Sequence, residues 1–232
     1  FAKIETFLNS QVNSEVSGNV IDICPVGALT SKPFRFKARS WEMSQHEFIS
    51  PHDCLGSNLY AHVKGNKFGN KLLRVVPKQD EDINEIWISD RDRFSYEAMN
   101  SEDRLDSPMM RLVGELENVD WEQALSASVS LLQKHLSKKG SDSLCALTTS
   151  QVTLEEGFLL QKLVRGLGSN NIDFRQHSNN DLYDPSFYGI NCKFSELDHS
   201  DCVFVLGCDM RSQAPALHLR LRKAWYQNEA SI

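Results

Sequence analysis

The chain has 232 residues, of which 41% are hydrophobic and 24% charged, and its net charge is −6. This length suffices for one large or two small domains, and the acidic balance excludes the basic surface that nucleic-acid binding needs. No apolar run approaches the roughly 20 residues that span a bilayer, and the first residues lack a signal-peptide pattern. We therefore expect no nucleic-acid partner and no direct membrane insertion. Because the chain begins with Phe1 rather than Met, we interpret it as a fragment of a longer protein.

The six cysteines are Cys24, Cys54, Cys145, Cys192, Cys202 and Cys208. A chain of this size does not need disulfide bonds for stability. The cysteines therefore indicate a reducing compartment in which the thiols are free or bind metal, although the sequence does not exclude one disulfide. Cys202 opens an apolar run and is expected to pack in a core. His46, His52 and Cys54 do not match the spacing of a structural zinc site and lack an evident fourth ligand.

Cys24 begins the sequence Cys-Pro-Val-Gly-Ala-Leu. This sequence is typical of the last cysteine ligand in a ferredoxin-type cysteine motif. Pro25 fixes the turn, and Gly27 lets the backbone approach inorganic sulfur. Such a run has the form C-x2-C-x2-C-x3-C-P, but residues 1–23 contain no cysteine. Cys24 is therefore either an inert structural thiol or a ligand of an iron–sulfur cluster whose other ligands lie elsewhere. The second reading is chemically reasonable, because the cysteine before proline can serve a different cluster from its neighbours in sequence.

The first hundred residues predict mainly extended structure. Residues 1–16 alternate briefly and then become polar, which predicts a strand or extended piece that leads into a short helical turn around Cys24. Short strand-like runs at 57–63 and 71–76, separated by Gly and Asn, predict a small β-rich domain. The polar residues 101–119 then predict a connector.

From Asp120 onward, strands and helices are expected to alternate. Asp120 and Gln123 form a plausible capping pair for a helix that ends at Gly140. Its apolar stripe is expected to be buried. The members of the stripe are Trp121, Leu125, Val129, Leu132 and Leu136. Strands are expected at 143–149 and 171–174, on either side of a helix with a capping box at Thr153 and Glu156.

A third strand is predicted at 202–206, because successive apolar positions suit a strand covered on both faces. A last helix begins at Pro215. Its buried side is expected to hold Leu217, Leu221, Ala224 and Trp225. Arg220, Arg222 and Lys223 are interpreted as a solvated face rather than a phosphate site. The alternation as a whole predicts a parallel, Rossmann-like α/β layer.

Three stretches carry a family resemblance: residues 24–42, residues 81–94 (EDINEIWISDRDRF) and residues 104–111 (RLDSPMMR). They closely resemble the large, G-type iron–sulfur subunits of respiratory complex I, the NADH:quinone oxidoreductase. The second stretch more distantly resembles the amino-terminal domain of molybdenum bis-pterin oxidoreductases.

The resemblance implies a multi-domain fold of mixed α/β and α+β class. It places the tail of a ferredoxin-like iron–sulfur domain at 1–43 and a small β-rich domain at 44–100. A connector follows at 101–119, and residues 120–232 start a Rossmann-type α/β domain like that of molybdopterin oxidoreductases.

The resemblance also implies that Cys24 is the fourth ligand of a [4Fe–4S] cluster, with the other three ligands outside this chain. Catalytic molybdenum enzymes carry a further cluster in the β-rich domain. Its four cysteine positions fall here at Ser50, Asp53, Ser57 and Ser89, while the solitary Cys54 lies one position out of register. We therefore expect this domain to keep the fold of a cluster domain and to bind no cluster.

The α/β domain is expected to hold neither molybdenum nor pterin. Residues 167–173 and 206–209 resemble loops that hold a pterin dinucleotide, but the glycine fingerprint G-x-G-x-x-G is absent. The place of the molybdenum ligand falls at Asn179, where no cysteine is near, although Ser178 or Asp181 could be argued into the role.

The family implies an electron-transfer subunit that passes electrons from NADH along iron–sulfur clusters towards quinone. Its partners would be other peripheral-arm subunits, which alone bind NADH and FMN. It would be membrane-associated through this translocase, facing the bacterial cytoplasm or the mitochondrial matrix. No catalytic residue is expected in this chain, since no serine, histidine and acid group together. Two alternatives stay open: part of a molybdenum bis-pterin oxidoreductase such as a formate dehydrogenase, and a non-redox scaffold in which Cys24 is inert.

Overall fold

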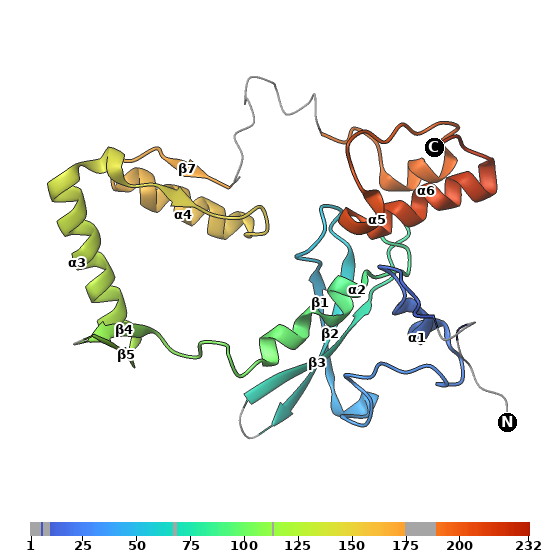
Figure 1. Cartoon of the computed structure of the whole chain (residues 1–232), viewed down its shortest axis with the longest axis horizontal. Helices are drawn as coiled ribbons and strands as arrows, with labels where there is room; N and C mark the ends of the chain where they lie inside the picture. The colour runs from blue at the N-terminus through green and yellow to red at the C-terminus, as the bar shows by residue number, and fades with distance from the viewer. Residues whose placement is uncertain (1–5, 7–9, 67–68, 113, 175–188) are drawn as a thin grey trace. The chain divides into compact units, whose positions relative to one another are not determined.

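The structure is a computed structural model that describes residues 6, 10–66, 69–112, 114–174 and 189–232. The chain divides into two units, one formed by Phe1–Glu102 with Tyr188–Ile232 and the other by Asp103–Phe187. Figure 1 follows the elements along the chain from blue to red. None of the described helices is both long and apolar enough to cross a membrane.

The first unit is built on an antiparallel sheet with the strand order β1-β2-β3. Its strands are β1 (Ser44–Ile49), β2 (Asn58–Asn66) and β3 (Gly69–Pro77). The register pairs Phe48 with Leu59, and a bulge interrupts the second pairing between His62 and Val63. The predicted strand runs 57–63 and 71–76 are thus confirmed in β2 and β3.

The small core of this sheet is shared with the segment that follows it. Leu59, Val75, Ile88 and Tyr96 are buried together, and other partly buried side chains pack against them. Ile88 and Tyr96 flank α2 (Asp90–Phe94), and η3 (Ser95–Asn100) follows directly. Burying each large apolar side chain contributes about 1.5–3 kcal/mol, so the core holds α2 against β3. Figure 1 shows α2 beside the sheet.

Residues 10–42 lead into the sheet without forming a strand. They contain α1 (Asn19–Ile23), which ends next to Cys24 as the predicted helical turn should, and η2 (Ser40–Glu42). The strand or extended piece predicted over residues 1–16 falls partly outside the described residues, and residues 10–16 are coil and turn.

The C-terminal part of the first unit is helical. Its elements are η6 (Phe194–His199), α5 (Met210–Gln213) and α6 (Pro215–Asn228). Pro215 begins α6 as predicted, and Leu221 and Ala224 are buried, but Trp225 is exposed. The prediction that Trp225 lies on the buried side is therefore wrong.

The predicted strand at 202–206 does not form. Cys202 makes only an isolated bridge with Ser231, and no described strand lies beside the run to complete a ladder. Its apolar residues therefore stay accessible, with Phe204 84% exposed, and the prediction that Cys202 packs in a core is wrong because that thiol is exposed.

The second unit contains a hairpin followed by alternating helices and short strands. Its elements are β4 (Met109–Leu112), β5 (Glu115–Asn118), α3 (Trp121–Lys139), η4 (Ser141–Ser143), β6 (Ala146–Leu147), α4 (Leu154–Gly166) and β7 (Ile172–Asp173). The segment predicted as a connector thus holds a hairpin, which turns at Gly114 with a φ of 98°. β6 and β7 pair in parallel, as the predicted alternation requires.

The helices of this unit begin at the predicted capping residues, but the apolar stripe of α3 is not buried as expected. The Asp120 side chain accepts the Gln123 N–H at 2.7 Å, and the capping box at Thr153 and Glu156 is present. No residue of α3 is buried, and Trp121 of its stripe is 67% exposed. The two-residue strands β6 and β7 are too small to cover it. The described residues therefore confirm a mixed α/β chain with small sheets, without a complete Rossmann-like layer.

Candidate functional site

Cys24 lies at the C-terminal end of α1 with backbone amides directed at its sulfur. Its own N–H donates to the Val20 carbonyl at 3.2 Å. The chain then turns through Gly27, whose φ of 65° is in the left-handed region. Hydrogen bonds from the backbone of Leu29 and then Val26 lower the pKa of the half-buried Cys24 thiol. Successive amides of this kind stabilise an anion, and the thiolate is the form of cysteine that binds metal.

The segment after Cys24 is attached to the sheet. The Arg74 guanidinium of β3 lies 4.6 Å from the centre of the Phe34 ring, a cation–π contact. Its Nε also donates to His62 Nδ1 at 2.8 Å. The turn that carries Cys24 therefore leads directly into a segment that is fixed on β3.

A second turn, at residues 53–57, binds its own side chain in a similar way. Asp53 Oδ1 accepts N–H groups from Leu55 at 3.1 Å and Gly56 at 3.0 Å. The Ser57 hydroxyl donates to the other oxygen of the same carboxylate. The carboxylate thus receives backbone amides from residues that follow it, and a serine completes its hydrogen bonds.

Asp92 of α2 lies next to this turn and is 3% exposed. Its carboxylate accepts the Ser50 hydroxyl at 2.6 Å and the Ser89 hydroxyl at 2.8 Å. Burial raises the pKa of Asp92, and the two hydroxyl groups oppose that shift. The Ser50 N–H also donates to the Ser57 carbonyl at 2.9 Å. The four positions singled out for a missing cluster, Ser50, Asp53, Ser57 and Ser89, therefore share one hydrogen-bonded region and offer oxygen instead of sulfur.

The other candidate ligands do not meet. His46 lies 3.0 Å from the Ser44 hydroxyl and His52 lies 2.8 Å from that of Ser95, while Cys54 is exposed. Within the described ranges, no group of three or more His, Cys, Asp or Glu side chains could hold a metal ion. All six cysteines are free thiols. The stretch around Asn179, with Ser178 and Asp181, lies outside the described residues.

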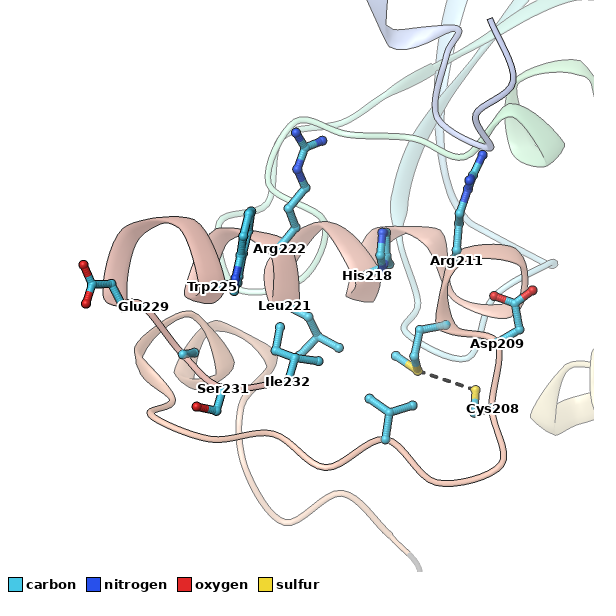
Figure 2. Close-up of a pocket in the computed structure, with 13 residues that line it drawn as sticks. Cys208, Asp209, Arg211, His218, Leu221, Arg222, Trp225, Glu229, Ser231 and Ile232 are labelled. Atoms are coloured by element: carbon cyan, nitrogen blue, oxygen red, sulfur yellow. Dashed lines mark hydrogen bonds between the residues drawn. The ribbon is translucent and has the colours of Figure 1, made fainter.

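A pocket of about 840 Å³ lies between α6 and residues 205–211 (Figure 2). Cys208 and Asp209, from a loop singled out for pterin binding, line it. Leu221 and Ile232 point towards this segment, whereas Arg222 points away from it. The loop therefore borders a pocket with an apolar inner wall.

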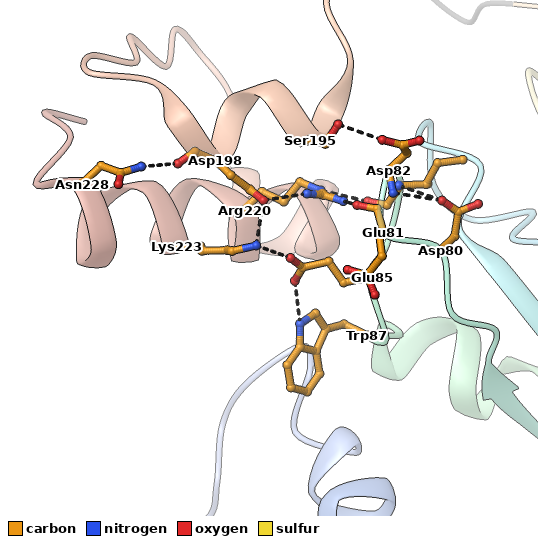
Figure 3. A network of polar contacts seen from close by, with 11 residues as sticks. Asp80, Glu81, Asp82, Glu85, Trp87, Ser195, Asp198, Arg220, Lys223 and Asn228 are labelled. Carbon is orange, nitrogen blue, oxygen red and sulfur yellow. Dashed lines mark hydrogen bonds and ion pairs between the residues drawn. The ribbon is translucent and has the colours of Figure 1, made fainter.

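Sequence reasoning missed a buried polar network on α6 (Figure 3). Arg220 is 2% exposed and donates to Asp198 Oδ2 at 3.0 Å and to the Ile83 carbonyl at 3.0 Å. Lys223 donates to the same Asp198 oxygen at 2.8 Å and to Glu85 at 2.5 Å, and these bonds raise the pKa of Lys223. The prediction of a solvated face is wrong for Arg220, because a carboxylate and backbone carbonyls compensate its charge.

Three family profiles match parts of the chain. The profile described as "Molybdopterin oxidoreductase" matches residues 104–232. "NADH-ubiquinone oxidoreductase NDSU1/NuoG-like, 4Fe-4S domain" matches residues 43–97, and "NADH-quinone oxidoreductase subunit 3, ferredoxin-like domain" matches residues 1–30.

Curated relatives align with almost the whole chain. The NADH-ubiquinone oxidoreductase 75 kDa subunit of Reclinomonas americana is 34% identical over 99% of this chain. The mitochondrial 78 kDa subunit of Candida albicans is 36% identical over 99%, and the G-type subunit of the NADH-quinone oxidoreductase of Rickettsia felis is 36% identical over 94%. The aligned part makes up 34%, 31% and 31% of these proteins, so the chain spans about a third of their length.

Proposed function

Because the chain belongs to the molybdopterin oxidoreductase family and its relatives are subunits of NADH–quinone oxidoreductase, we propose that it is an electron-transfer part of respiratory complex I. In this role it passes electrons that come from NADH through iron–sulfur clusters towards quinone. The enzyme is the whole complex, and no catalytic residue is assigned to this chain. The names of the relatives do not favour the alternative of a formate dehydrogenase.

The amides around Cys24 carry this proposal. A half-buried thiol whose pKa is lowered by the backbone of Leu29 and Val26 fits the thiolate that an iron–sulfur cluster requires. Cys24 would bind one iron of a [4Fe–4S] cluster, with Pro25 and Gly27 shaping the turn and three further ligands supplied from outside this chain. The cluster supplies one-electron transfer. The amides would tune its potential by hydrogen bonding to the ligand sulfur.

The rest of the chain serves as scaffold in this proposal. The β-rich domain binds no cluster of its own, a role that the oxygen side chains at Ser50, Asp53, Ser57 and Ser89 support. The α/β domain holds no molybdenum or pterin. The boundaries proposed for the parts remain 1–43, 44–100, 101–119 and 120–232.

The proposed partners are other subunits of the peripheral arm, which bind NADH and FMN. Through them the protein is associated with the membrane and faces the bacterial cytoplasm or the mitochondrial matrix. The relatives support membership of an NADH–quinone oxidoreductase, which is mitochondrial in Candida albicans.

The test compares Cys24→Ser with Cys54→Ser in the full-length subunit, purified without air. We expect Cys24→Ser alone to lower the iron content and to remove one [4Fe–4S] signal from the electron paramagnetic resonance spectrum, with molybdenum absent from all samples. In cluster-free protein, the rate at which Cys24 reacts with iodoacetamide should be measured as a function of pH. Its midpoint should lie below the pKa of about 8.5 that is typical of free cysteine. If the iron content and the spectrum of Cys24→Ser are unchanged, Cys24 is not a cluster ligand. If the subunit contains one molybdenum per chain, the α/β domain is a working enzyme.

A further inference from the structure

Asn19 joins the segment before Cys24 to the segment before α2. Its side chain is buried and donates to the Ile88 carbonyl at 2.8 Å. In return, the Ile88 N–H donates to Asn19 Oδ1 at 3.1 Å. One asparagine amide thus satisfies both polar groups of a buried residue, as a neighbouring strand would.

Asp90, in the first turn of α2, holds the residues that lead into α1. Its carboxylate accepts the Gly18 N–H at 2.7 Å and the Ser17 hydroxyl at 2.5 Å. Its own N–H donates to the Glu15 carbonyl at 2.7 Å. Charged acceptors make the stronger hydrogen bonds, so the start of α1 is fixed at this carboxylate.

Arg93, one turn further along α2, reaches α1 itself. It forms an ion pair with Asp22 and donates to Asn19 Oδ1 at 3.2 Å, and its side chain is 5% exposed. Its aliphatic part lies against Gly18, where an added Cβ would come within 2.6 Å of Arg93 Cδ. The position before α1 therefore accepts glycine because the arginine side chain occupies the adjacent space.

The Arg93 contacts specify geometry more than they add stability. Its buried Nε has no hydrogen-bond partner within the described part of the chain, and a buried ion pair often gains little over an apolar replacement. A five-residue helix such as α1 is not stable by itself in water, so its direction comes from these tertiary contacts. Cys24 follows α1 directly, so α2 also determines where the sulfur lies.

From these contacts we propose that Asp90 and Arg93 are positioning residues for the cluster ligand Cys24, and that Arg93 also tunes the cluster potential through Asp22. The inference rests on the proposed role of Cys24. Arg93 neutralises a carboxylate two residues before the ligand, and net charge near a cluster is one determinant of its potential. Removing the guanidinium leaves a negative charge there, so the potential should become more negative.

Arg220 provides a matched control within the same unit. Like Arg93 it is a buried arginine paired with an aspartate, and its side chain is 2% exposed. Its partners are Asp198 and the carbonyl groups of residues 81 and 83, and none of them belongs to residues 17–24. A purely structural loss should therefore affect Arg93→Met and Arg220→Met alike.

The experiment uses the full-length subunit, purified without air, as wild type, Cys24→Ser, Arg93→Met, Arg93→Lys and Arg220→Met. The Cys24→Ser spectrum identifies the cluster signal that depends on this ligand. For that signal we expect Arg93→Met to give a more negative midpoint potential. Iron loss to a chelator should also be faster, by at most the roughly 10- to 100-fold by which groups bonded directly to a metal ligand affect metal affinity. Arg93→Lys should restore most of the potential, because it keeps the charge, and Arg220→Met should leave the potential unchanged.

The outcomes separate the two proposals. If Cys24→Ser leaves iron and spectrum unchanged, Cys24 is not a ligand and both proposals fail. If it removes the signal but Arg93→Met and Arg220→Met behave alike, the ligand role stands and the positioning role fails. If Arg93→Met does not fold, Asp90→Asn replaces it, and a wild-type spectrum and rate of iron loss in that variant would overturn the inference.

Discussion

The turns at residues 24–29 and 53–57 show how one backbone arrangement can serve two chemistries. In each, a side chain receives N–H groups from residues that follow it, and a glycine takes a positive φ, 65° at Gly27 and 76° at Gly56. The first turn presents a half-buried sulfur. In the second, the Asp53 carboxylate also accepts the hydroxyl of the buried Ser57. The two turns thus have a similar backbone arrangement, but only the first presents the thiol from which the usual ligand of an iron–sulfur cluster is made.

Each turn also lies next to a buried asparagine, and removing that residue should have the largest effect. Asn19 binds the Ile88 amide, and Asn84 accepts the Asn58 N–H at 2.9 Å just after the second turn. Asn19→Ala and Asn84→Ala should each lower local stability by about 2 kcal/mol, because buried backbone groups lose their partners. Site-resolved hydrogen exchange should show the Ile88 amide exchanging about 30-fold faster in the first variant and the Asn58 amide in the second, at about 1.4 kcal/mol per factor of ten.

The two variants control for each other. Asn19→Ala should leave the Asn58 amide nearly as protected as in wild type, and the converse should hold for Asn84→Ala. If both amides accelerate equally in both variants, the whole unit opens together and the two turns are not held independently.

Asp53→Ala should have an intermediate effect. It removes the acceptor for the Leu55 and Gly56 amides, and losses of this kind cost about 1 kcal/mol when a side chain caps backbone N–H groups. Those two amides should then exchange about five- to tenfold faster, measured as before. Asp53→Asn keeps an acceptor oxygen and should stay close to wild type. Equal acceleration in the asparagine variant would mean that the charge, rather than the hydrogen bonds, orders the turn.

The smallest predicted effect is a pH dependence at Asp92. Burial raises its pKa in the folded protein, so the stability that this group contributes is present below the usual aspartate pKa of about 3.9 and is lost as the pH rises through the folded value. Asp92→Asn removes this titration. The melting temperature of the variant, relative to wild type, should therefore rise with pH from about pH 4 upward. Parallel melting curves for the two proteins across that range would contradict the raised pKa.

Local signals predicted much of the fold. The capping oxygen of Asp120, the capping box at Thr153 and the proline that opens α6 each act within a few residues, and all three lie where the sequence places them. The sequence that follows Cys24 likewise identified it as the candidate ligand. Such features depend on neighbours in the chain, which a single sequence displays directly.

Features that depend on distant partners were missed. Arg220 is buried because Asp198 and carbonyl groups more than a hundred residues away receive its N–H groups, and nothing near it in the sequence shows this. The apolar run at 202–206 suits a covered strand, but among the described residues no neighbouring strand pairs with it. The short helix α2 gave no periodic signal, although Asp90 and Arg93 bind residues 17–22 and Asp92 binds Ser50.

The contacts that fix Cys24 also set an order for the assembly of the protein. The bonds from α1 and from the preceding Gly18 to Ile88, Asp90 and Arg93 join residues 69 to 74 positions apart in the chain. During synthesis the ligand emerges well before these partners, and domains fold as units once their parts are present. If a cluster were delivered to the nascent chain, the sulfur of Cys24 would not yet be held in its final position. The sulfur of the proposed cluster ligand therefore reaches its final position only after residues 88–93 have been made and have folded against α1.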